Sequence, residues 1–108
     1  MNYSLHPEAR EDLREAAEYY KQRAGIILSQ SLLAEFGRSV DLLLRHPGLG
    51  AVWRYGKRRF VMERFPYSLI YTVTGDELRI WAVAHHSRRP GYWRNSKVVG
   101  FTRQAARP

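Results

Sequence analysis

The chain has 108 residues, 44% of them hydrophobic, which suits one domain with a single modest core. It contains no cysteine, which excludes disulfides and thiolate metal sites and fits a reducing compartment. No apolar run approaches the ~20 residues that span a bilayer, and the N-terminus lacks a basic-then-apolar signal pattern. We therefore expect a soluble, cytoplasmic protein.

The net charge of +8 belongs almost entirely to the second half of the chain. Residues 1–50 carry six Lys/Arg and seven Asp/Glu, whereas residues 51–108 carry twelve and three. A segregated positive field attracts polyanions. Because the cations cluster with aromatic residues, we favour a surface for an anionic partner, RNA above all, over a solvated basic surface that only keeps the protein soluble.

Two helices are predicted in the first half of the chain. Residues 2–5 alternate and predict a short strand, after which Pro7 and an acidic first turn mark a helix start and Gly25 its end. A second apolar stripe runs from Leu28 to Leu44 and ends at His46-Pro47-Gly48. Since few residues separate the helices, they should form an antiparallel hairpin. Their stripes are expected in the core: Ala9, Leu13, Ala16, Ala17, Tyr20 and Ala24, then Leu28, Leu32, Leu33, Phe36, Val40, Leu43 and Leu44.

From residue 51 the apolar period changes from helical to alternating. Strands are predicted over residues 51–55, 58–65, 67–74 and 78–84, with a tight hairpin turn at Gly75-Asp76. An initial strand, two helices and an antiparallel β-meander of about four strands make an α+β fold. Alternation along the last strand predicts one face toward the helices, with Leu78, Ile80, Ala82 and Ala84, and an open face with Arg79, Trp81, Val83 and His85.

The last strand runs into a group of bases, cations and rings. RNA cleavage by internal attack needs a proton acceptor, cations for the phosphate and a proton donor, and histidine and arginine suit these roles. The candidate catalytic residues are His85, His86, Arg88 and Tyr92, and the candidate substrate-binding residues are Arg54, Lys57, Arg59, Arg79, Arg89 and Trp93. Consecutive histidines on a strand point to opposite faces, so at most one should join an open-face site. The alternative is structural, with Trp93 capping the core edge and Arg88 paired with a carboxylate.

A metal or other cofactor is not expected. The four histidines and the carboxylates show no metal-ligand spacing, and there is no glycine-rich loop to cradle phosphate. Residues 1–97 are assigned to one domain, and residues 98–108, which have little periodicity, to a flexible C-terminal tail.

Several short motifs, in order along residues 2–94, resemble the RelE/ParE toxin superfamily. They are Glu8-Ala9 with Asp12-Leu13, Tyr19-Tyr20, His46-Pro47-Gly48-Leu49-Gly50, Arg58-Arg59, Phe65-Pro66-Tyr67 with Ile70-Tyr71, Gly75-Asp76-Glu77, and Ala84-His85-His86 with Arg88-Arg89-Pro90-Gly91-Tyr92-Trp93. The resemblance implies the toxin of a type II toxin–antitoxin module. Its implied partner is a small, often acidic, antitoxin that wraps the toxin in a hetero-oligomer.

The resemblance leaves two activities open. RelE-like members cleave mRNA on the ribosome without metal, whereas ParE-like members poison DNA gyrase without catalytic residues. Tyr92 stands where the RelE-like branch has a functional tyrosine, and Arg88 lies in the corresponding basic stretch, but Ser68 stands where that branch has an arginine. His85 or His86 would then substitute. We favour ribosome-dependent mRNA cleavage, with gyrase poisoning as the alternative and a degenerate toxin that acts only as a binding module as the third reading.

Overall fold

A computed structural model describes residues 1–87 of the chain. Four of the candidate residues, Arg88, Arg89, Tyr92 and Trp93, lie outside this range, as does the proposed tail at residues 98–108. The boundary between a domain ending at residue 97 and a tail therefore stays a prediction. Within the described range, no helix is long and apolar enough to cross a membrane.

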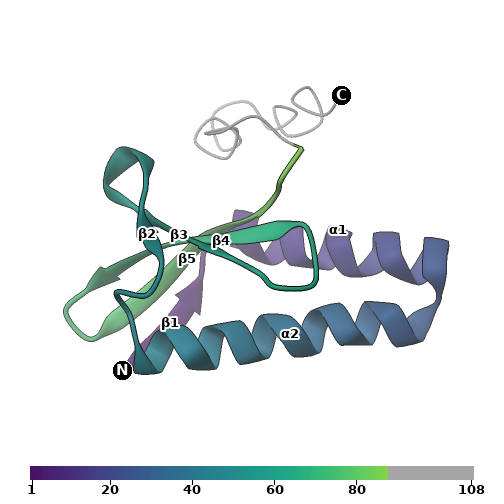
Figure 1. Ribbon diagram of the computed structural model, residues 1–108, viewed down its shortest axis with the longest axis horizontal. Helices are drawn as coiled ribbons and strands as arrows, with labels where there is room; N and C mark the ends of the chain where they lie inside the picture. The colour runs from purple at the N-terminus through teal and green to yellow at the C-terminus, as the bar shows by residue number, and fades with distance from the viewer. Residues whose placement is uncertain (88–108) are drawn as a thin grey trace.

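The fold is a helical hairpin packed on one five-stranded sheet (Figure 1). In chain order the elements are β1 (Asn2–Leu5), α1 (Pro7–Ala24), α2 (Ile26–Arg45), β2 (Ala51–Val52), a 3-10 turn (Arg54–Gly56), β3 (Arg58–Val61), β4 (Tyr67–Thr74) and β5 (Glu77–His85). The strand order is β1-β5-β4-β3-β2. Strands β2 to β5 pair antiparallel, while β1 returns beside β5 in parallel. The predicted α+β class is confirmed.

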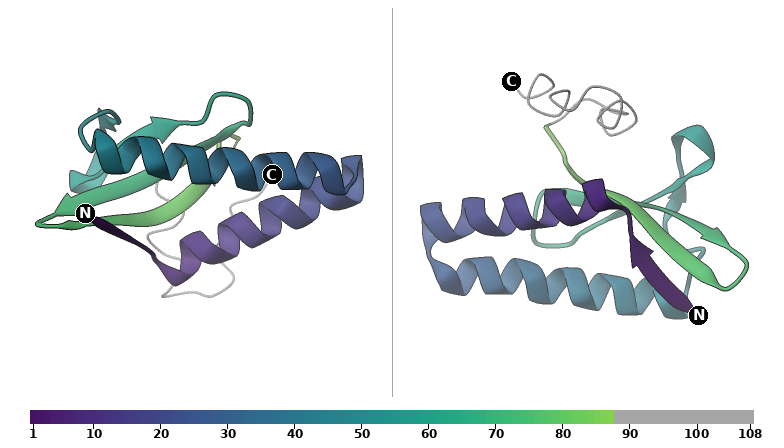
Figure 2. Two further views of the ribbon diagram at one scale, coloured as in Figure 1. Left: turned by 90° about the horizontal axis from the view of Figure 1, so that it is seen from below. Right: turned by 180° about the vertical axis from the view of Figure 1, so that it is seen from behind.

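Local signals at the helix ends explain the hairpin. Pro7 opens α1, and the ring Nδ1 of His6 accepts the Glu8 N–H at 3.0 Å, which satisfies one of the unpaired first-turn amides. Gly25 separates the helices with φ +98°, a backbone conformation that glycine adopts without strain. The two helices consequently lie side by side and antiparallel (Figure 2).

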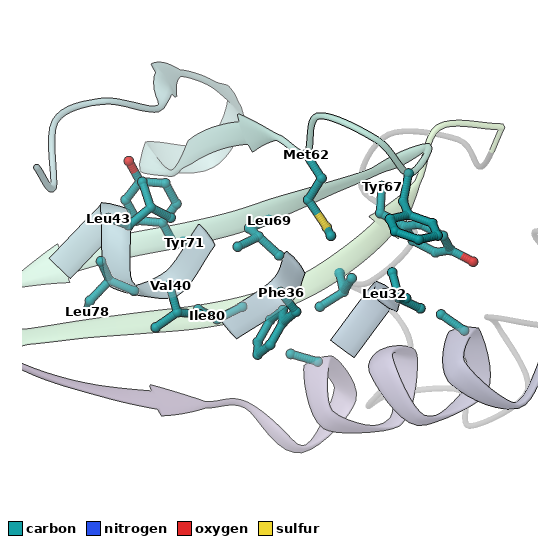
Figure 3. Packing of buried hydrophobic residues seen from close by; sticks show 14 residues of the cluster. Leu32, Phe36, Val40, Leu43, Met62, Tyr67, Leu69, Tyr71, Leu78 and Ile80 are labelled. Carbon is teal, nitrogen blue, oxygen red and sulfur yellow. The ribbon is translucent and has the colours of Figure 1, made fainter. Parts of the chain in front are cut away.

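The core lies between this hairpin and one face of the sheet. Figure 3 shows side chains of α2 meeting those of β4 and β5; the labelled buried residues are Leu32, Phe36, Val40, Leu43, Met62, Tyr67, Leu69, Tyr71, Leu78 and Ile80. The predicted stripe of α2 is confirmed at its centre but is wrong at two positions. Leu28 and Leu33 are 38% and 43% exposed, because they lie at the margin of the stripe and near the hairpin end of the helix.

Two predicted strands are shorter than expected. The strand predicted over residues 51–55 ends at Val52, because Tyr55 turns the chain with φ +61°. The strand predicted over residues 58–65 ends at Val61, because only the Met62 N–H still donates to Tyr67 O, and the amides of Glu63 and Arg64 leave the sheet. Glu35 of α2 accepts the N–H groups of Glu63 and Arg64 at 2.8 and 2.9 Å. A buried helix carboxylate thus replaces the neighbouring strand as the acceptor.

Candidate functional site

A bulge in β5 decides which side chains reach the open face of the sheet, the face away from the helices. Ile70 pairs with Ala82 but Tyr71 pairs with Ile80, so Trp81 is an extra residue on β5. Before the bulge, Leu78 and Ile80 face the helices. After it, Val83 joins the helix-side core, and Ala82 packs with Ile70 in a second, open-face cluster. The predicted placement of Ala82 and Ala84 toward the helices, and of Val83 on the open face, is therefore wrong.

Asp12 of α1 stabilises this bulge from the helix side. Its side chain is 4% exposed, and its Oδ2 accepts the buried Val83 N–H at 3.1 Å. A bulge disrupts the hydrogen-bond ladder, and a buried N–H without an acceptor is costly. The carboxylate supplies an acceptor just after the extra residue.

The bulge also moves His85 away from its predicted position. His85 was expected beside Arg79 on the open face, but its ring lies edge-on to buried Tyr67, with centroids 5.0 Å apart. Its Nδ1 accepts the Ser87 N–H at 3.1 Å and lies 2.7 Å from the Ser87 hydroxyl. The prediction that only one histidine joins the open face therefore holds, with His86 in that place.

His86 forms a three-residue cluster with Ser68 of β4 and Arg59 of β3. The Nε–H of Arg59 donates to Ser68 Oγ at 3.1 Å, and Ser68 Oγ lies 3.0 Å from His86 Nε2. The loop before β4 helps to position His86, because the backbone N–H of His86 donates to Pro66 O at 2.9 Å. Two of the predicted site residues, Arg59 and His86, are thereby brought together through a third that was not predicted.

The hydrogen-bond donor and acceptors of the Ser68 hydroxyl bear on which nitrogen of His86 carries the proton. Ser68 is 1% exposed, so its hydroxyl depends on protein partners. Arg59 can only donate, so Oγ accepts from it and keeps its own hydrogen for an acceptor such as His86 Nε2. In the neutral tautomer with the proton on Nδ1, the ring's lone pair at Nε2 would be committed to the serine.

Desolvation and the nearby positive charge of Arg59 hold the pKa of His86 below its ordinary value, although a backbone carbonyl at Tyr67 acts the other way. The ring is therefore uncharged at neutral pH. The cluster combines one permanent cation with one neutral histidine.

A second cluster on the open face surrounds the bulged tryptophan. The Lys57 Nζ and the Arg79 guanidinium carbon lie 4.9 and 5.1 Å from the centroid of the Trp81 ring, within cation–π distance. The Trp81 Nε1–H donates to Thr72 Oγ1 at 2.9 Å, and Arg79 also donates to Ser4 Oγ at 3.0 Å. Lys57 and Arg79, both predicted to bind substrate, are held on the open face by these contacts.

The other predicted site residues lie apart from both clusters or cannot be placed. Arg54 is exposed on the 3-10 turn, with its guanidinium carbon 5.9 Å from the Trp53 ring centroid. Arg88, Arg89, Tyr92 and Trp93 are outside the described residues. Among residues 1–87, no group of three or more His, Cys, Asp or Glu side chains could hold a metal ion.

Sequence reasoning did not assign a role to two residues that organise this face. Ser68 was noted only as the replacement for an arginine, although alternation along β4 places it opposite the core residues Tyr67 and Leu69. Asp12 was taken as a charge favourable to a helix start. Its place three residues after Ala9 and four before Ala16 puts it on the buried stripe of the helix, and this spacing is the signal that could have found it.

Comparison with known proteins identifies the family. The model of the family described as "ParE toxin of type II toxin-antitoxin system, parDE" matches residues 3–90. A solved structure titled "Chromosomal ParDE TA system from P. aeruginosa" superposes with a TM-score of 0.71 at 23% identity, covering 79% of this chain and 95% of that one; at this identity the likeness shows the fold. No curated protein sequence matches the chain. Because the family match spans most of the chain, the protein belongs to the ParE toxin family of type II toxin–antitoxin systems.

Proposed function

We propose that this toxin arrests growth by binding DNA gyrase and trapping the enzyme on cleaved DNA, without catalysing a reaction itself. Membership of the ParE family supports this target, since ParE-like toxins act on gyrase. The observation that carries the non-catalytic part is the state of the two histidines. Each has a nitrogen engaged by a neighbouring serine, Nε2 of His86 by Ser68 and Nδ1 of His85 by Ser87.

A general base must direct a lone pair at the proton that it removes. Nε2 of His86 lies against the hydroxyl of Ser68, a residue that is 1% exposed, so a ribose 2′-hydroxyl has no access to that nitrogen. His85 faces the helix side of the sheet, where its ring contacts Tyr67, away from Lys57, Arg59 and Arg79 on the open face. This arrangement suits binding of a partner better than proton transfer.

The test uses purified full-length toxin, purified gyrase and plasmid DNA. We expect loss of supercoiling and an accumulation of linear, gyrase-bound DNA after denaturation of the complex. In cells, induced expression should halt DNA replication and induce the DNA-damage response while protein synthesis continues at first. A toxin that leaves gyrase supercoiling unchanged at concentrations that arrest cells would overturn the proposal.

Ribosome-dependent mRNA cleavage is a second candidate, and one observation favours it. Arg59 places a phosphate-binding group beside the neutral His86, so a cation and a titratable ring share the open face. If this reading holds, His86→Gln abolishes toxicity, and mapped mRNA 5′ ends fall in register with the reading frame. Intact mRNA during growth arrest would exclude it.

The toxin of such a module implies a cognate antitoxin. We propose that the two form a hetero-oligomer in which an acidic antitoxin segment covers the open-face cations. Binding of the antitoxin and of the target should then compete. A toxin–antitoxin complex that retains full affinity for the target would contradict this arrangement.

A further inference from the structure

We propose that the open face of the sheet binds the phosphate backbone of duplex DNA through Lys57, Arg59 and Arg79, which we call the open-face cations. The inference deepens the proposed function. The choice of DNA as the ligand rests on that function, because gyrase presents a DNA segment to any protein bound at its cleavage site. It adds a direct toxin–DNA contact to the expected contact with the enzyme.

The open-face cations come from different parts of the sheet. Arg79 lies on β5, Lys57 immediately precedes β3, and Arg59 lies on β3 across β4 from β5. Arg59 pairs with Ile70 and Arg79 with Thr72, so the two arginines are two strands apart and two residues out of register, with their Cα atoms roughly 12 Å apart. The sheet therefore presents a spread of cations rather than one point charge, which suits a repeating polyanion.

The face also fixes the cations in place. Lys57 and Arg79 both pack on the Trp81 ring, and Arg59 is tied to buried Ser68. All three side chains are half-buried, so they lose less conformational freedom on binding than a fully extended surface lysine. Within residues 1–87, each of the two guanidinium groups donates one side-chain hydrogen bond, out of five N–H donors in total.

The contacts of Trp81 favour backbone binding over base reading. Two cations and the His6 ring, 5.3 Å away, crowd the Trp81 ring, and its N–H is taken by Thr72. A ring held in this way positions the cations and is poorly placed to stack on a splayed base. Phosphate contacts without base contacts carry no sequence information, so the binding should be independent of sequence.

The test is fluorescence anisotropy of a short labelled DNA duplex of mixed sequence, titrated with full-length toxin in the absence of gyrase. We expect micromolar, sequence-independent binding whose affinity falls steeply with salt. In the double variant Lys57→Gln/Arg79→Gln, affinity at low salt should drop roughly tenfold, and the log–log salt slope should become shallower by about 1.8, because each lost phosphate contact removes about 0.9. Circular dichroism checks that the variant is folded.

The matched control is Arg10→Gln/Arg38→Gln, which removes the same charge from exposed positions on α1 and α2. It should change DNA affinity by less than about twofold, since these helices lie on the other side of the sheet. Equal losses in the two double variants would show that net charge alone attracts DNA and would overturn the proposal. Absence of DNA binding by the unmodified toxin, or much tighter binding of RNA through the same residues, would also overturn it.

The gyrase assay on the same variants separates this inference from the proposed function. DNA binding that depends on the open-face cations, in a toxin that leaves supercoiling unchanged, would support the DNA contact and refute the gyrase target. Gyrase poisoning by a toxin that binds no DNA would refute the DNA contact alone.

Discussion

Glu35 should be a major determinant of stability because it replaces a strand as hydrogen-bond partner. Its side chain is 6% exposed, and one oxygen, Oε2, accepts the N–H groups of Glu63 and Arg64. The other oxygen, Oε1, accepts the Nε–H of Arg64 at 3.1 Å. Glu35→Ala removes all three acceptor contacts where the chain leaves β3.

The magnitude follows from the two amides more than from the ion pair. Hydrogen bonds to a charged acceptor contribute about 1.5–3 kcal/mol each, and partial access of water to this loop favours the lower value. The Arg64 side chain is 61% exposed, so its ion pair should add less than about 1 kcal/mol. We therefore expect Glu35→Ala to lower the free energy of unfolding by about 3 kcal/mol, or the melting temperature by roughly 13 °C.

Glu35→Gln is the matched control. Its amide oxygen can still accept both backbone N–H groups, while its NH2 group faces the Arg64 donor, so the loss should be about 1 kcal/mol. Urea unfolding followed by circular dichroism measures both variants. If the glutamine variant is as unstable as the alanine variant, the ion pair rather than the amides dominates, and the reasoning above is wrong.

The same carboxylate predicts the direction of the acid response. Burial opposes its charge, but the hydrogen bonds from Arg64 and Glu63 prevail and hold the pKa of Glu35 below its ordinary value of 4.5. A carboxyl group with a lowered folded-state pKa stabilises the fold above the unfolded-state pKa, and this stabilisation is lost as pH falls through the folded-state value. Below about pH 4.5 the unmodified protein should therefore lose stability faster than Glu35→Gln.

Three further substitutions test the bulge, the loop before β2 and the open face. Asp12→Ala should cost about 2 kcal/mol in urea unfolding by orphaning a buried amide of β5, and Asp12→Asn about half of that. Gly50→Ala should lower the free energy of unfolding by about 2 kcal/mol, because the added Cβ would lie 2.6 Å from Tyr71 Oη. A variant as stable as the unmodified protein would mean that the loop moves freely. In an NMR titration the His86 ring should protonate below pH 6.5, and Arg59→Gln should raise its pKa; an unchanged value would exclude the charge effect.

The helices were predictable because their signals are local. Pro7, an acidic first turn and Gly25 mark the ends of α1, and each acts through the backbone groups of its own turn. The apolar period of α2 likewise reports a face that is buried along most of its length. Strand β4 was predicted with its observed limits because Tyr67, Leu69 and Tyr71 recur at every second position toward the helices without interruption.

The open face was predicted less well because its arrangement depends on contacts distant in sequence. Alternation along β5 gave the right faces for Leu78 and Arg79 and the wrong ones after Trp81, since nothing in the local pattern indicates an extra residue. Asp12, which accepts the Val83 N–H just after the bulge, is 71 positions from this partner. A carboxylate on a helix start has many uses, and only the tertiary structure selects this one.

Ser68 has the largest consequence for function. Had an arginine stood at this position, two guanidinium groups would face the open surface beside His86, and both would be available to a phosphate. The small hydroxyl instead lies buried between Arg59 and His86. It accepts the Nε–H of Arg59 and contacts Nε2 of His86. It converts a possible proton-transfer pair into a rigid basic surface. The same residue that departs from the RelE-like pattern thus supplies the physical argument for the proposal that this toxin binds its target without cutting it.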